Sequence, residues 1–259
     1  MKFLVLILSV FLCCSSAMAE TPEEKGYAIA AEDDRRDNGF GDFQASMVMV
    51  LKNRQGEEST RYIENSTLEV QGDGDKSLVV FDRPRDIKGT ALLNFSHPTG
   101  MDDQWLYLPA LKRVKRISSA NKSGPFMGSE FAYEDISSQE LSKYTYKWLR
   151  DEALDGQECF VLERIPVYEN SGYTRQVVWI DKDEYRVLKE DFYDRKDTLL
   201  KTLVYRGYKK YLEQYWYPDE MFMVNHQTGK STLLSWKDYR FRTGLTDEDF
   251  NKNTLQRSR

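Results

Sequence analysis

The chain changes its hydrophobic period once, near residue 40. Between residues 27 and 31, apolar side chains recur at the spacing of an amphipathic helix. Thr21 suits the N-cap of this helix, Pro22 suits its first position, and Glu24 completes a capping box. Asn38-Gly39 is a typical stop signal. The sequence therefore predicts a helix that begins after Thr21 and ends before Asn38.

From residue 43 onward the period is two, which is typical of strands. The predicted strands cover residues 43–53, 61–70, 77–83, 87–96, 104–108, 112–117, 144–153, 158–167, 174–181, 186–193, 199–208, 213–217, 221–225 and 231–239. Asp155-Gly156 predicts a tight hairpin turn because this pair readily takes positive φ angles. The alternation lapses between residues 118 and 142, where 133–141 could hold a short helix or two. Strands that follow one another usually pair antiparallel, so we expect one long meander in a single domain, residues 20–259.

Several of these strands are apolar on both faces. Residues 47–51 and 91–93 do not alternate as a sheet with one wet face should. The chain also holds 8 Met, 16 Tyr and 13 Phe residues. Flexible thioethers and aromatic rings suit an adaptable apolar cavity, and they suit an ordinary core equally well. Both interpretations stay open at this point.

The N-terminus has the pattern of a cleaved signal peptide, residues 1–19. Lys2 supplies the basic start, residues 3–14 are apolar, and small residues end at Ala19. The apolar run is shorter than the roughly 20 residues that a membrane-spanning helix needs. A retained membrane anchor is the alternative, and acylation of Cys13 or Cys14 is another, although no lipobox precedes either cysteine. We expect an exported, periplasmic protein.

Charge and composition exclude several classes of function. The net charge of −5 gives no electrostatic reason to expect nucleic acid. Cleavage leaves Cys159 alone, so no intrachain disulfide is expected, and its strand context predicts a buried thiol. The chain has two histidines, no paired metal-ligand motif, no phosphate-binding loop and no nucleophile elbow. Residues 72–75 lack the later ligands of a calcium loop. We therefore expect no enzyme, metal or cofactor; a hydrolase with an acid/base pair is the remaining alternative.

The basic segment 112–116 has two interpretations. Alternation would place Arg113 on one face of a strand and Arg116 on the other. Such a strand can be a solvated edge whose charges block unwanted pairing. It can also contact an anionic head group or an acidic partner at the mouth of a cavity.

Residues 105–117 (WLYLPALKRVKRI) and 126–136 (FMGSEFAYEDI), supported by 154–162 (LDGQECFVL), resemble the LolA-like family of outer-membrane lipoprotein-sorting proteins. This resemblance implies a mainly β (α+β) fold: a single curved antiparallel sheet forming an incomplete β-barrel, with a few helices covering its open side. It also implies a monomeric carrier in the periplasm of the Gram-negative envelope. Such a carrier transfers lipoprotein acyl chains, or another lipid-like ligand, non-covalently between membranes or membrane proteins, with an inner-membrane transporter or an outer-membrane acceptor as partner.

Alternation and the resemblance together give candidate site residues. The predicted lining of the hydrophobic cavity is Met47, Met49, Leu51, Leu92, Phe95, Leu106, Leu108, Phe126, Met127 and Phe131. Arg113 and Arg116 are the predicted contacts for a head group or partner. The alternative is an envelope sensor or transporter-associated protein-binding module of the same fold, whose cavity is filled by its own side chains.

Overall fold

A computed structural model of the protein describes residues 19–255. The predicted signal peptide, except for Ala19, lies outside the described residues. So do Cys13 and Cys14, the two candidate sites of acylation. The helices and strands are α1 (Pro22–Asp37), β1 (Asp42–Lys52), β2 (Glu58–Leu68), β3 (Lys76–Arg83), β4 (Ala91–Phe95), β5 (Asp103–Leu108), β6 (Arg113–Ile117), β7 (Tyr144–Leu154), β8 (Gln157–Pro166), β9 (Tyr173–Asp181), β10 (Val187–Asp194), β11 (Leu199–Arg206), β12 (Lys209–Tyr211), β13 (Tyr215–Tyr217), β14 (Glu220–Asn225), β15 (Ser231–Phe241) and α2 (Lys252–Leu255).

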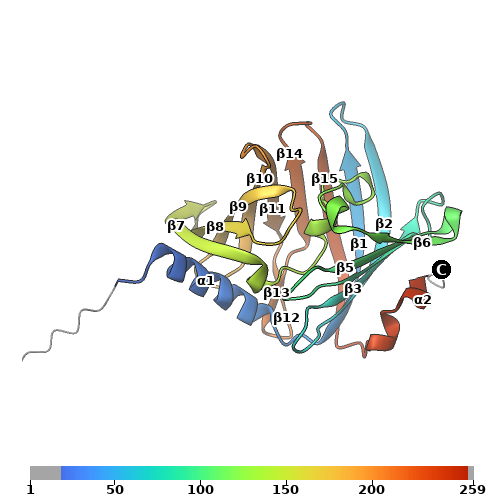
Figure 1. The fold of residues 1–259 in the computed structure, drawn as a ribbon, viewed down its shortest axis with the longest axis horizontal. Coiled ribbons are helices and arrows are strands. Elements are labelled where there is room, and N and C mark those ends of the chain that lie inside the picture. The colour runs from blue at the N-terminus through green and yellow to red at the C-terminus, as the bar shows by residue number, and fades with distance from the viewer. Residues whose placement is uncertain (1–18, 256–259) are drawn as a thin grey trace, which may run out of the picture.

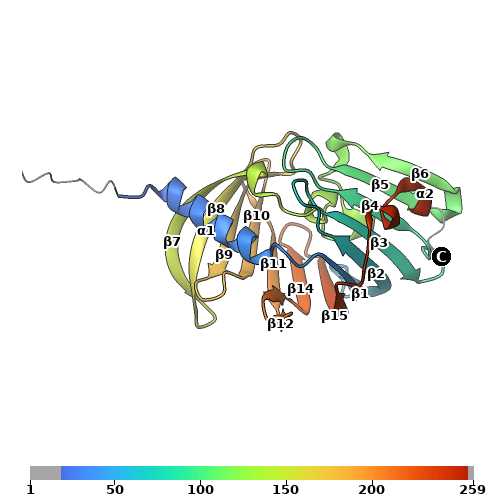
Figure 2. The ribbon, with the colours of Figure 1, turned by 90° about the horizontal axis from the view of Figure 1, so that it is seen from below.

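Thirteen of these strands form one antiparallel sheet in the order β6-β5-β4-β3-β2-β1-β15-β14-β11-β10-β9-β8-β7. The sheet is strongly curved and does not close, because β6 and β7 remain as free edges (Figures 1 and 2). The predicted fold class is therefore confirmed. One difference from a simple meander is that β1 pairs with both β2 and β15. Another is that β12 and β13 form a separate hairpin.

Local signals explain where several elements begin and end. α1 starts with the predicted capping box: the side chain of Thr21 accepts from the Glu24 N–H, and the Glu24 carboxylate accepts from the Thr21 N–H. Asp155 and Gly156 both have positive φ angles in the two-residue turn between β7 and β8. The predicted strand 87–96 is shorter than expected and starts at Ala91.

The sheet has a covered face and an outer face. On the covered face lie α1 and residues 118–143, which we call the covering segment; on the outer face the short helix α2 packs on β4 (Figure 2). α2 and the turn before it bury Leu255 and Phe250 against Trp105. The thiol of Cys159 is buried on the outer face, as its strand pattern predicts.

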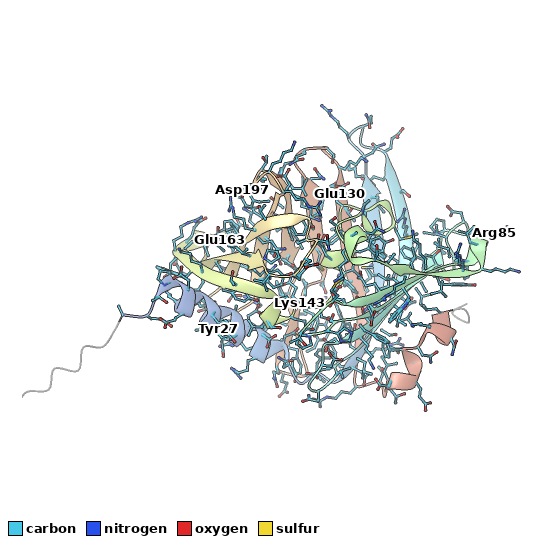
Figure 3. All side chains as sticks on the ribbon, in the orientation of Figure 1. Tyr27, Arg85, Glu130, Lys143, Glu163 and Asp197 are labelled. Carbon is cyan, nitrogen blue, oxygen red and sulfur yellow. The ribbon has the colours of Figure 1, made fainter. Side chains whose placement is uncertain are left out.

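The covering segment fills one half of the covered face, where it packs on β1 to β6 and also contacts β11, β14 and β15. Its 3₁₀ turns replace the expected short helices, and its Phe126 and Phe131 are fully enclosed in the main apolar cluster. Buried ion pairs hold it in place: Lys201 donates to Asp135 over 2.5 Å, and Lys143, at the end of the segment and labelled in Figure 3, donates to Asp102. This half of the interior is therefore packed with the protein's own side chains.

Candidate functional site

α1 lies directly on β7 because Gly26 carries no side chain. A Cβ at this position would stand 2.6 Å from the backbone nitrogen of Trp148 and 2.7 Å from the carbonyl carbon of Lys147. Lys25 adds a contact, with its ammonium nitrogen 3.6 Å from the centre of the Trp148 ring. The first half of the helix is thereby held against the edge of the sheet.

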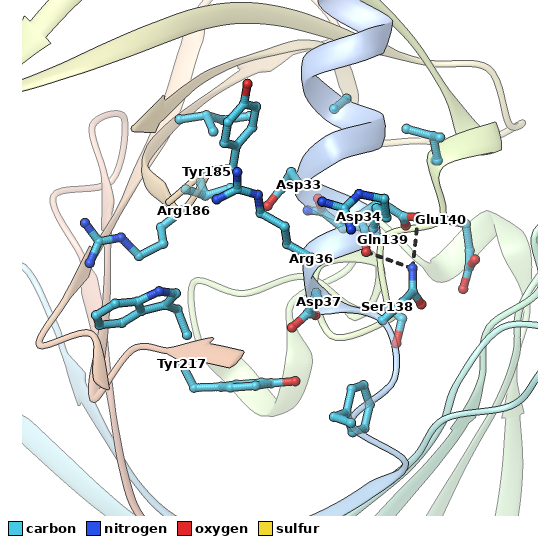
Figure 4. A pocket seen from close by; sticks show the side chains of 18 of the residues that line it. Asp33, Asp34, Arg36, Asp37, Ser138, Gln139, Glu140, Tyr185, Arg186 and Tyr217 are labelled. Atoms are coloured by element: carbon cyan, nitrogen blue, oxygen red, sulfur yellow. Dashed lines mark hydrogen bonds between the residues drawn. The ribbon is translucent and has the colours of Figure 1, made fainter. Parts of the chain in front are cut away.

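Further along α1, the side of the helix that faces the sheet is first apolar and then acidic. Ile29 and Ala30 are buried against Leu162, Val178 and Ile180 of β8 and β9. Asp33 and Asp37 are four positions apart, so they lie on the same side of the helix. Both line the space between α1 and the sheet (Figure 4).

A buried polar network forms part of the opposite wall. The guanidinium of Arg164 on β8 donates to the carboxylate of Glu190 on β10 over 2.6 Å and to the amide oxygen of Gln176 on β9 over 2.6 Å. The hydroxyl of Tyr205 on β11 donates to the other oxygen of Glu190 over 2.7 Å. Arg164 also donates to the side-chain oxygen of Gln139, which belongs to the covering segment. These bonds fix the polar groups on the sheet side in place.

Between α1 and this network is a cavity of about 770 Å³. It is bordered by the loop 69–75, by residues 138–141 and by the β12–β13 hairpin (Figure 4). Its apolar and aromatic lining includes Leu162, Val178, Ile180, Val187, Tyr205, Tyr208 and Trp216. We call this space the α1 cleft. It offers an apolar and aromatic surface around the Arg164 network on the sheet side, and carboxylates together with the cations Arg35 and Arg36 on the helix side. This mixed lining is the chemistry of an amphipathic ligand site.

The carboxylates of the α1 cleft hold protons more strongly than exposed ones. Burial, and then the nearby Asp37, raise the pKa of Asp33 to about 8. Asp37 is more exposed, and desolvation by the surrounding protein raises its pKa to about 6, although a hydrogen bond with the hydroxyl of Tyr217 opposes this shift. Burial, together with Glu140, raises the pKa of Asp75 to about 7. Near neutral pH the cleft therefore contains carboxyl groups that can donate as well as accept hydrogen bonds.

Within residues 19–255, no set of three or more His, Cys, Asp and Glu side chains is arranged to hold a metal ion. The helices of the described chain include none with both the length and the apolar character needed to cross a membrane.

The predicted lining residues do not border the α1 cleft. Six of them, Met47, Met49, Leu92, Leu106, Phe126 and Phe131, are buried in the main apolar cluster, and Leu51, Leu108 and Met127 pack at its margin. The structure thus brings nine of the ten together, in contact with one another.

Phe95 is the exception, and its predicted orientation is wrong. It lies on the outer face, with its ring centre 5.2 Å from that of Trp105. The reason is the strand period of two: Leu92 faces the covered side, so Phe95, an odd number of positions away, must face the other way.

Arg113 and Arg116 lie on β6, which forms the free edge of the sheet. Both are exposed, and Arg116 donates to the carboxylate of Asp103. Neither residue borders the α1 cleft, so the two arginines do not lie at the mouth of this cavity.

The acidic and polar residues of the α1 cleft were missed by the sequence interpretation. A signal existed for some of them. Asp33 and Asp37 share a helix face, and Arg164 has the same strand parity as the buried Leu162, which places a charge among inward-facing positions. An inward charge in an apolar strand indicates a buried network, although not the residues that complete it.

An open antiparallel sheet with a cleft beneath a helix defines the class of this protein, the LolA-like fold. The crystal structure of a LolA superfamily protein from Nitrosomonas europaea has this fold, with a TM-score of 0.72, 22% identity, and coverage of 88% of this chain and 98% of that chain.

Two more similar structures show the family. An outer membrane lipoprotein-sorting protein domain from Vibrio parahaemolyticus, so named provisionally, is 62% identical, with a TM-score of 0.89 and coverage of 90% of this chain and 99% of that chain. A DUF1329 family protein from Desulfovibrio piger is 34% identical, with a TM-score of 0.86 and coverage of 91% and 99%. A family model described as "Uncharacterized protein" matches residues 73–257. No curated protein matches the chain significantly. The chain belongs to the same family as these two proteins, the DUF1329 family, and it has the LolA-like fold.

Proposed function

We propose that the protein is a periplasmic carrier that binds a lipid-like molecule non-covalently in the α1 cleft. The observation that carries this proposal is the cleft itself, whose volume of about 770 Å³ lies within the range of roughly 300–1,000 Å³ usual for small-molecule sites. The sorting role in the name of the Vibrio protein supports a carrier function. The predicted signal peptide supports export to the periplasm.

The two walls of the cleft suit the two parts of an amphipathic ligand. Each methylene of an alkyl chain buried against Val187, Tyr208 and Trp216, which line the cleft and are half-buried, would contribute about 0.8 kcal/mol. The polar group of the ligand would meet Asp33 and Asp37 on α1. Binding of this kind uses no covalent step and no cofactor. The six clustered apolar residues that come from strands would meet a ligand only if the covering segment moved away, since its side chains now contact them.

Native mass spectrometry of the gently purified protein tests the proposal. We expect a bound lipid-like mass in the wild type, and displacement of a fluorescent fatty acid by the extracted ligand. Val187→Trp should abolish both because Val187 lines the cleft. Val204→Trp is the matched control: it is also a half-buried strand valine, but it lies outside the cleft. An empty wild-type protein that also fails to bind the fatty acid would contradict the proposal.

The packed half of the covered face favours a second candidate, a protein-binding sensor or transporter-associated module of the same fold. Its apolar cluster contains Phe126 and Phe131 of the covering segment in positions that a ligand would otherwise take. For such a module we expect no lipid in either experiment, and stable capture of an envelope protein by the wild type and by Val187→Trp alike.

A further inference from the structure

The free edge formed by β6 and the turn before it combines an exposed leucine with a concentration of positive charge. Leu111 ends the 3₁₀ turn Pro109–Leu111 and is 68% exposed. Lys112 follows in the left-handed region, with a φ of 48°, which turns the chain sharply beside Leu111. Four of the five residues 112–116 are cations, and none is acidic.

These cations come from both faces of the sheet but lie along one edge. Arg113 and Lys115 share a strand face with Ile117, which packs on the covered side. Arg116 faces the outer side, next to Trp105 in the strand register. Lys252 of α2 is also there, its ammonium nitrogen 4.3 Å from the centre of the Trp105 ring.

Most of this charge is not neutralised within the protein. Arg116 is paired with Asp103, but Lys112, Arg113 and Lys115 form no ion pair with any residue between 19 and 255. The loop 84–90 lies at the same end of the sheet and brings Arg85, which projects outward at the right of Figure 3, together with Asp86, so it leaves the net charge of the edge unchanged. A chain with a net charge of −5 therefore presents one strongly basic edge.

From this arrangement we propose that the β6 edge docks the protein on an anionic phospholipid bilayer, with Leu111 entering the membrane interface. Basic residues around an apolar tip are attracted to anionic lipid, while the acidic remainder of the surface is repelled, so the edge faces the membrane. A protein strand added to this edge is disfavoured, because a short edge strand rich in Lys and Arg discourages strand pairing. The inference does not depend on what the α1 cleft binds.

Vesicle flotation tests this proposal with the purified protein. We expect binding to phosphatidylcholine vesicles that contain phosphatidylglycerol, no binding to pure phosphatidylcholine vesicles, and loss of binding as salt is added. The triple variant Lys112→Glu, Arg113→Glu, Lys115→Glu should lower partitioning by at least about 10-fold, since each cation near an anionic surface contributes severalfold. Leu111→Ser should lower it less, because only the apolar contribution is removed. All substituted side chains are exposed, and all except that of Leu111 are charged, so folding should be unaffected, as thermal unfolding can check.

The matched control reverses three exposed cations away from the edge: Lys230→Glu, Lys237→Glu and Arg240→Glu. This variant changes the net charge equally and should bind as the wild type does. Equal binding to both kinds of vesicle, no binding to either, or an equal loss in the control triple variant would overturn the proposal. Binding to an acidic envelope protein with no binding to vesicles would also overturn it and would assign the edge to protein recognition.

Discussion

The ion pair between Arg164 and Glu190 allows a quantitative test of the α1 cleft. Both side chains are almost fully buried, at 8% and 2% exposure, and their charged atoms are 2.6 Å apart. We consider Arg164→Met, which keeps the unbranched stem of the side chain but removes the guanidinium, with its charge and its donors. Glu190 would then be a buried carboxylate that has lost its cation, while the hydroxyl of Tyr205 still donates to it.

Breaking a buried pair by removing one partner costs about 3–5 kcal/mol in free energy of unfolding. For a protein of this length, that corresponds to a fall in Tm of about 6–20 °C. Adding Glu190→Gln to Arg164→Met removes the uncompensated charge but leaves an acceptor for Tyr205. The double variant should therefore be more stable than Arg164→Met alone by about 1–3 kcal/mol.

Urea unfolding followed by circular dichroism measures these differences, provided that the m-values agree. Arg150→Met is the matched control, since Arg150 pairs with Glu152 on the half-exposed edge strand β7 and its loss should cost at most about 1 kcal/mol. The reasoning is refuted if Arg164→Met costs no more than this control, or if Glu190→Gln fails to restore stability in the Arg164→Met background.

Three further predictions concern α1, the covering segment and the cleft carboxylates. Gly26→Ala should displace α1 from β7 and lower stability by about 1–3 kcal/mol despite the better helix propensity of Ala; faster amide exchange in α1 would show it, and unchanged exchange would contradict the close contact. Phe126→Ala should cost about 3–5 kcal/mol by urea unfolding because its ring is fully buried; a loss under about 1 kcal/mol would mean that the covering segment is not packed as described. The pKa values of Asp33 and Asp75 are raised to about 8 and about 7, so the folded protein keeps protons that the unfolded chain releases near pH 4. The free energy of unfolding should therefore fall as the pH rises from about 4 to about 8. Urea midpoints at several pH values would show this fall, and Asp33→Asn should reduce it; an identical pH profile in the variant would exclude Asp33 as a cause.

Local patterns in the sequence predicted most elements because their causes are local. The capping box at Thr21 fixes the start of α1, and the Asp155-Gly156 pair fixes the β7–β8 turn. The apolar cluster around Met49 and Leu106 was also anticipated, since strand alternation selects these positions. The resemblance to a family supplied the curved, open sheet, which no local pattern specifies.

The position of the α1 cleft could not be predicted in the same way. It depends on how closely α1 approaches β7 at Gly26 and on how far the covering segment extends across the sheet. Both are contacts between residues far apart in the chain, with no periodic signature. The apolar residues that stand out in the sequence are those that the protein packs against one another. The cleft is lined partly by charged residues such as Asp33 and Arg164, which a search for apolar positions does not find.

The pairing of β1 with β15 sets an order of events for folding. Met47 and Trp236 are register partners, so the centre of the sheet joins segments separated by almost the whole length of the chain. Because the chain is synthesised from the N-terminus, β1 has an unpaired edge until β15, the last long strand, has been made. Contacts at such sequence separation form slowly, and the waiting edge can pair with other chains. We therefore expect truncation before β15 to yield an aggregating product rather than a smaller folded one.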